Sequence, residues 1–175
     1  MQEQIQSIEV TEGLSATEGL SKTEQYLTFQ MIDKSYGLEI LNIKEIIEYS
    51  EVTEVPMTPD FILGVINLRG RVVPVIDLGL LFAGKSVVLT RRTSIIILEV
   101  KNSDLQLEIG IAVDVVNEVI DINSNDIEPS PSLGDKINTA FISGMAKLND
   151  EFLILLNVEN VMSVDEFTII SSIQA

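Results

Sequence analysis

The sequence predicts an all-β fold built from two similar units, and three observations lead to this expectation. Alternating apolar and polar residues recur in several segments, one pattern of residues is repeated along the chain, and few segments favour a helix. The most regular alternation lies at residues 105–115, where apolar side chains form one face and Gln106, Glu108 and Asp114 lie on the other. A half-buried strand has this period of two, whereas a helix has a period of 3.6.

The elements follow in order along the chain. Residues 1–22 are polar and acidic and predict a flexible acidic tail. Leu27, Phe29 and Met31 alternate with polar residues, which predicts a strand followed by a turn at 33–36. Residues 38–47 fit either a helical stripe or a strand that bends, and their β-branched content favours the strand. A short C-terminal helical segment is expected at 163–170.

An internal repeat divides the remaining chain into two halves. Six pairs of residues occur in the same order, with equal spacing except for one insertion before the phenylalanine of the second half. The pairs are Gly37 and Gly110, Glu45 and Glu118, Pro56 and Pro129, Phe61 and Phe141, Gly64 and Gly144, Asp77 and Asn157. We therefore expect two small β-barrel units, at 23–90 and 91–175. Each is too small to be very stable alone, so we expect the two to pack together.

Composition excludes several function classes. The chain of 175 residues contains no cysteine and no histidine, which excludes Cys-His and Ser-His-Asp catalysis and ordinary zinc sites. A net charge of −16 disfavours nucleic acid and anionic membrane surfaces as partners, so we expect protein partners. The N-terminal residues do not resemble a signal peptide, and no apolar run is long enough to span a bilayer, so the expected location is cytoplasmic.

Two segments match motifs of catalytic or metal-binding proteins. Residues 79–86 fit the phosphate-loop pattern G-x-x-x-x-G-K-[ST], but residues 87–100 indicate a strand where the motif requires a helix. Residues 121–126 resemble the start of a calcium loop, but Asp126 stands where glycine is required and Ser132 where glutamate is required. We interpret both matches as accidental. The paired carboxylates Glu45 and Glu48 could in principle act as acid and base, but we interpret them as a solvated face. The sequence thus predicts no enzyme, no cofactor and no metal site.

The segment 64–78 predicts a turn that joins two strands. Asn67 and Gly70 favour a turn, which would place Arg69 at its tip. An arginine at such a tip can present its planar fork to a carboxylate of a partner. Alternatively, Arg69 pairs with one of the many acidic residues of this chain, and both interpretations stay open.

Several stretches resemble the CheW-type chemotaxis coupling (adaptor) protein family. They are FILGVINLRGRVVPVIDL at 61–78, YLTF at 26–29, YGLEILNIKEI at 36–46, GIAVDVVNEV at 110–119 and FISG at 141–144. The similarity extends in order from about residue 24 to the C-terminus. It implies two packed five-stranded SH3-like barrels and a non-catalytic scaffold that joins the cytoplasmic tips of methyl-accepting chemoreceptors to the C-terminal regulatory domain of a histidine kinase. It also implies recruitment to membrane-bound receptor arrays without insertion into the membrane.

The same resemblance implies a receptor-binding site. Arg69, Gly64 and Ile43 fall on receptor-binding positions of the family, and Asn67, Glu45 and Gly70 are adjacent candidates. Kinase contact is implied for apolar barrel faces, which cannot be assigned to residues. Two alternatives stay open: an adaptor of the same fold in another kinase pathway, such as surface motility, and a nucleotide hydrolase built on residues 79–86.

Overall fold

The computed structural model describes residues 22–49, 52–102, 105–129, 141–157, 159 and 164–174. The predicted acidic tail therefore lies outside the described residues, apart from its last residue. The strands and helices are β1 (Thr23–Met31), β2 (Lys34–Glu39), β3 (Ile43–Glu48), β4 (Ile62–Leu68), β5 (Arg71–Ile76), α2 (Leu78–Ala83), β6 (Ser94–Asn102), β7 (Leu105–Val113), β8 (Val115–Asn123), β9 (Ile127–Glu128), β10 (Ile142–Leu148), β11 (Glu151–Leu156) and α3 (Val164–Gln174).

These elements confirm the predicted fold class. Nearly all of them are strands, and α3 is the expected C-terminal helix, extended to Gln174. The ambiguous segment 38–47 is not an α-helix, but the expectation of one strand that bends is only partly right, because a 3-10 helix at Ile40–Asn42 separates two strands, β2 and β3. The helix α2, which begins directly after Asp77, was not expected from the sequence.

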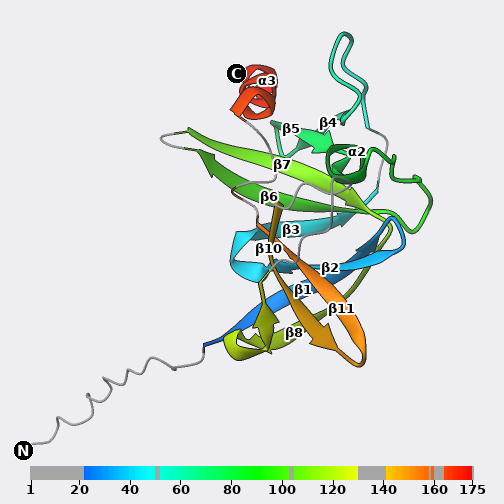
Figure 1. The fold of residues 1–175 in the computed structure, drawn as a ribbon. Helices are drawn as coiled ribbons and strands as arrows, with labels where there is room; N and C mark the ends of the chain where they lie inside the picture. The colour runs from blue at the N-terminus through cyan, green and yellow to red at the C-terminus, as the bar shows by residue number, and fades with distance from the viewer. Residues whose placement is uncertain are drawn as a thin grey trace, which may run out of the picture.

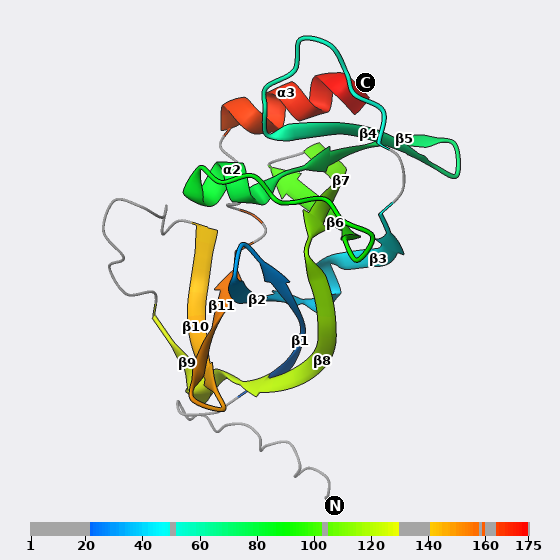
Figure 2. The ribbon, with the colours of Figure 1, turned by 90° about the vertical axis from the view of Figure 1, so that its right-hand side faces the viewer.

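The strands form two strongly curved sheets. One has the order β8-β1-β2-β11-β10-β9 and is called barrel I; the other has the order β3-β6-β7-β5-β4 and is called barrel II. Barrel I lies in the lower half of Figure 1, and barrel II lies above it with α2 and α3. Figure 2 shows how β1, β2, β8, β10 and β11 curl around the axis of barrel I. Apart from the short β9, the expectation of two five-stranded barrels is confirmed.

The division of the chain between the barrels differs from the prediction of 23–90 and 91–175. Barrel I takes β1 and β2 from the first half of the sequence and β8 to β11 from the second, and barrel II takes the reciprocal set. The 3-10 helix at Ile40–Asn42 turns the chain from barrel I into barrel II, and a bend at Asp114 turns it back. The repeat is real, but the two repeats exchange strands.

Parallel strand contacts show that the two barrels are equivalent. In barrel I, Gly37 of β2 lies beside Leu155 of β11; in barrel II, Gly110 of β7 lies beside Val75 of β5. Parallel neighbours need a long connection, and here each pair joins strands from different repeats. The repeated glycines found in the sequence thus occupy the same structural position.

One hydrophobic core lies between the barrels and joins them. It contains Phe29 and Leu38 of barrel I, Ile96 and Ile109 of barrel II, and Phe82 of α2, all buried. Smaller clusters fill each barrel separately. The shared core confirms that the two units pack together.

Candidate binding surface

The predicted turn after β4 is a two-residue hairpin loop. Arg69 and Gly70 have positive φ values of 54° and 85°, and Leu68 pairs with Arg71 across the hairpin. Two positive φ values are typical of a type I′ turn, whose twist matches that of the flanking strands. The Asn67 side chain accepts a hydrogen bond from the Gly70 amide at 2.9 Å, so Asn67 fixes the turn rather than facing a partner freely.

Arg69 forms a two-pronged ion pair with Glu45 of β3. Arg69 Nη1 lies 2.7 Å from Glu45 Oε1, and Nη2 lies 3.1 Å from Oε2. The strands β3 and β4 are the two ends of the barrel II sheet, so this pair bridges them. Hydrogen bonds from Arg69 lower the pKa of the Glu45 carboxyl. The interpretation that Arg69 pairs with an acid of its own chain is therefore confirmed, although 67% of the Arg69 side chain remains exposed.

Further ion pairs extend from this turn across barrel II. Lys44 Nζ lies 2.6 Å from Glu108 and 3.7 Å from Glu99, and Arg71 also pairs with Glu108. Burial alone would raise the pKa of Glu108, but hydrogen bonds from Lys44 and Arg71 outweigh burial and lower it. The barrel II ion-pair cluster thus balances its charges; it consists of Lys44, Glu45, Arg69, Arg71, Glu99 and Glu108.

The other two predicted site residues lie elsewhere. Ile43, in the same strand as Glu45, is half-buried and packs against the shared core. Gly64 lies in a bulge near the far end of β4, about 16 Å along the strand from Arg69. A Cβ atom on Gly64 would lie 2.3 Å from the Thr53 carbonyl oxygen, so Gly64 lets the chain at Thr53 pair with Val65. Gly64 therefore contributes to the shape of the barrel II surface at this bulge.

Sequence reasoning missed an exposed apolar residue beside the turn. Val72 of β5 pairs with Asn67 of β4 and is 44% exposed. Paired residues share one face of a sheet, so an exposed apolar side chain lies beside Asn67, close to the turn. The sequence carried no signal for this, because residues 72–76 are a continuous apolar run in which only Val72 is exposed.

The phosphate-loop match does not form an anion site. The helix α2 ends at Ala83 with Gly84 as its C-cap, and the described residues 87–93 contain no helix. The buried carboxylate of Asp77 accepts hydrogen bonds from the amides of Leu80 and Val87 and from the Ser86 hydroxyl, at 3.2, 3.0 and 2.8 Å. This carboxylate takes donors of the loop that would otherwise be available to a phosphate group. The interpretation of the match as accidental is supported.

The calcium-loop match is the end of a strand and a polar turn. The strand β8 runs to Asn123, and a 3-10 helix follows at Ser124–Asp126. Ser132 lies outside the described residues. Within the described part of the chain, no group of three or more acidic residues could hold a metal ion. No helix among these residues is long and apolar enough to cross a membrane.

Comparisons with a family model, with known protein sequences and with solved structures all point to the same family. A family model for the CheW-like domain matches residues 25–166. The chemotaxis protein CheW of Klebsiella aerogenes is 35% identical over 150 residues, which cover 86% of this chain and 88% of that protein. CheW of Helicobacter pylori is 37% identical over 142 residues, covering 81% and 82%. The crystal structure of the scaffolding protein TtCheW from Thermoanaerobacter tengcongensis has a TM-score of 0.73 and 34% identity, covering 87% of this chain and 96% of that one.

Proposed function

Because the chain belongs to the CheW-like domain family, we propose that it is a non-catalytic chemotaxis adaptor that joins chemoreceptor tips to a histidine kinase. The observation that carries this proposal is the family match along almost the whole described chain, with relatives named as chemotaxis proteins and a solved relative named as a scaffolding protein. An adaptor breaks no bond. It raises the effective concentration of one partner beside the other and couples their conformational states.

Receptor contact is proposed for the turn at Arg69 and the residues beside it. A guanidinium has five N–H donors, and Glu45 is the acceptor of two hydrogen bonds. Donors therefore remain on a side chain that is largely exposed, and Val72 beside Asn67 is an exposed apolar residue close to the turn. A receptor carboxylate can therefore add to the Arg69–Glu45 pair at the rim, or exchange with Glu45. Ile43, Asn67 and Gly70 support this surface.

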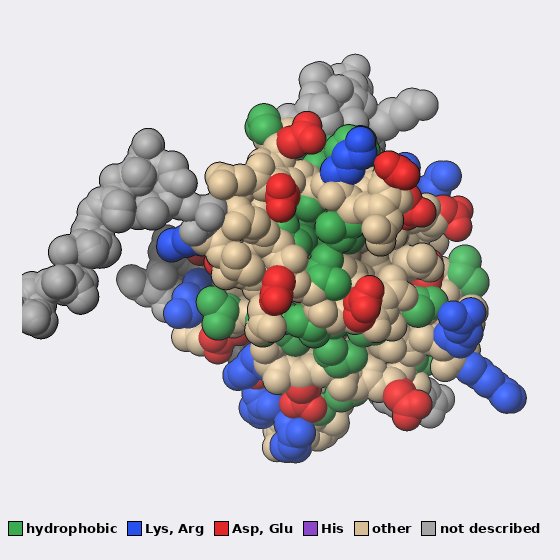
Figure 3. Space-filling model, turned by 90° about the horizontal axis from the view of Figure 1, so that it is seen from below, with side chains coloured by type: hydrophobic (Ala, Val, Ile, Leu, Met, Phe, Trp, Pro, Cys, Tyr) green, Lys and Arg blue, Asp and Glu red, His purple; other side chains and the backbone are tan. Residues whose placement is uncertain are grey.

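Kinase contact is proposed for apolar faces of the barrels. Seen from below, the barrel I face carries hydrophobic side chains at its centre with Asp and Glu among them, and Lys and Arg mainly toward the edge (Figure 3). Two different barrels offer two different faces, which permits heterologous contacts with a regulatory domain of similar design. The large hydrophobic residues exposed on the described surface are Leu41, Ile46, Met57, Val72, Val88, Leu89, Val119 and Phe152. The protein would act in the cytoplasm, at membrane-bound receptor arrays.

Calorimetric titration of the full chain with the C-terminal regulatory domain of the chemotaxis kinase from the same organism tests this proposal. Saturable one-to-one binding is expected. Absence of binding, with both proteins shown to be folded, would contradict the chemotaxis assignment and favour an adaptor of another kinase pathway.

A further inference from the structure

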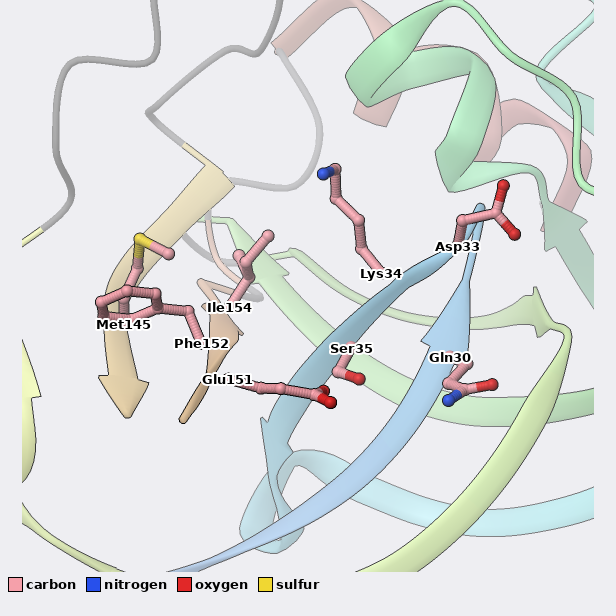
Figure 4. A pocket seen from close by; sticks show the side chains of 8 residues that line it. All are labelled: Gln30, Asp33, Lys34, Ser35, Met145, Glu151, Phe152 and Ile154. Atoms are coloured by element: carbon pink, nitrogen blue, oxygen red, sulfur yellow. The ribbon is translucent and has the colours of Figure 1, made fainter. Parts of the chain in front are cut away.

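A cavity of barrel I lies beside the β10–β11 hairpin. It has a volume of about 360 Å³ and is called the barrel I pocket; its lining includes Thr28, Ser35, Glu118, Asp121, Glu151 and Phe152. A neighbouring cavity of about 480 Å³ shares Ser35, Glu151 and Phe152. In the view of that cavity, Glu151 extends toward Ser35 on the neighbouring strand β2 (Figure 4).

The repeat identifies the residue of barrel II that corresponds to Glu151. Leu148 pairs with Glu151 across the two-residue turn of β10–β11, as Leu68 pairs with Arg71 across the turn of β4–β5. Glu151 therefore occupies in barrel I the position that Arg71 occupies in barrel II. The charge at this position is reversed.

The repeat also identifies the counterpart of Ser35. The glycines Gly37 and Gly110 are equivalent, and Ser35 precedes the first as Glu108 precedes the second. In barrel II, Glu108 binds the side chain of Arg71 between the parallel strands β7 and β5. In barrel I the corresponding pair is Glu151 and Ser35, and an open pocket lies there instead of an ion pair.

The charge of the barrel I pocket is therefore unbalanced. Glu118, Asp121 and Glu151 line it, and none of the described residues that line it is Lys or Arg. Within the described part of the chain, none of these three carboxylates forms an ion pair. Lys34 lines only the neighbouring cavity, where its side chain extends away from Glu151 (Figure 4).

The chemistry of the pocket favours a guanidinium over an ammonium. The planar guanidinium presents five N–H donors in a rigid fork that matches carboxylates, whereas a lysine ammonium is a compact point charge. The ring of Phe152 does not contribute, because it extends toward Met145, in the opposite direction from Glu151 (Figure 4). The combination of carboxylates and a counterpart position filled by arginine is complementary to an arginine side chain.

We propose that the barrel I pocket binds an arginine side chain of a partner protein, which supplies the cation that Arg71 supplies within barrel II. This inference rests on the repeat and the charges of the pocket. It does not depend on which signalling pathway the chain serves, so it can fail without affecting the proposed function.

Nuclear magnetic resonance titration of the ¹⁵N-labelled full chain tests the proposal. The probe is N-acetyl-arginine amide, and the control ligand is N-acetyl-citrulline amide, which has nearly the same shape without the charge. Saturable shifts of the amides of Ser35, Glu118, Glu151 and Phe152 are expected with the arginine probe, at millimolar concentrations given its size. Citrulline should produce much smaller shifts.

Substitutions distinguish the pocket from general attraction to an acidic protein. Glu151→Gln should weaken probe binding about two- to fivefold, as expected for one exposed ion pair. Glu48→Gln removes the same charge from an exposed position of β3 and should leave probe binding unchanged. The double variant Ser35→Glu, Glu151→Arg recreates the barrel II pair and should abolish binding.

Three results would overturn the proposal. They are equal shifts with citrulline, an equal loss of affinity in Glu48→Gln and Glu151→Gln, and the absence of saturable shifts at the pocket. The amide spectrum of each variant shows whether it remains folded, and Glu151→Gln changes only an exposed side chain.

Discussion

The buried carboxylate of Asp77 should be among the most important polar groups for the stability of this protein. Asp77 is fully buried, caps α2 through the Leu80 amide and also accepts hydrogen bonds from the Val87 amide and the Ser86 hydroxyl. Replacing it with alanine removes a helix cap, at a cost of about 1 kcal/mol. The substitution also leaves the buried Val87 amide without its acceptor, which costs about 1–3 kcal/mol more. We expect Asp77→Ala to lower the free energy of unfolding by about 2–4 kcal/mol.

Urea denaturation followed by circular dichroism measures this change. The midpoint should fall while the slope of the transition stays the same, because the surface exposed on unfolding is unchanged. Asn157→Ala is the matched control: Asn157 is the repeat counterpart of Asp77, but within the described residues its side chain accepts a hydrogen bond only from the exposed Glu159 amide. The control should cost less than about 1 kcal/mol. An effect of Asp77→Ala no larger than that of Asn157→Ala would refute the reasoning.

Three further substitutions test the binding surface and the barrels. Arg69→Glu places a second carboxylate beside Glu45. Calorimetry should show that this variant binds a receptor cytoplasmic fragment about fivefold more weakly or worse, while its melting temperature changes little. Unchanged affinity in a folded variant would contradict the receptor-binding assignment. Gly64→Ala should destabilise by about 1–3 kcal/mol in thermal denaturation, because its Cβ would clash with the Thr53 carbonyl; a neutral effect would mean that the bulge relaxes freely. A hydrogen bond with Glu24 raises the pKa of Glu39, so the folded state holds this proton more tightly, and stability falls as the pH rises from 4.5 through the raised pKa. Glu39→Gln should therefore raise the melting temperature more at pH 7 than at pH 4; equal changes at both pH values would exclude this carboxylate pair as the cause.

Local patterns predicted the strands and the repeat but not how the repeats exchange strands. Alternation identified β1 and β7, and the repeated glycines mark the parallel contacts of both barrels. A Cβ on Gly37 would lie 2.9 Å from the Leu155 side chain, which explains why this position is glycine. The same constraint would exist if the facing strand came from the same repeat. Partner choice depends on the direction of the chain after Ile40–Asn42, which no local pattern encodes.

The helix α2 and the ion pair of Arg69 show two further limits. The residues Leu80, Leu81 and Phe82 have the composition of a buried strand, and only Asp77 before them signalled a helix cap. The turn at Arg69 was predictable from Asn67 and Gly70, which have local conformational roles. Its pairing with Glu45 was not, because that contact forms only when the two ends of the barrel II sheet meet.

Co-sedimentation of the kinase with receptor-containing membranes, with and without this protein, tests the central claim most directly. If the chain is an adaptor, the kinase should sediment with the receptors only when the chain is added, and the Arg69→Glu variant should reduce the amount that sediments. Sedimentation of the kinase to the same extent without the chain, or none in the presence of folded wild-type chain, would contradict the account.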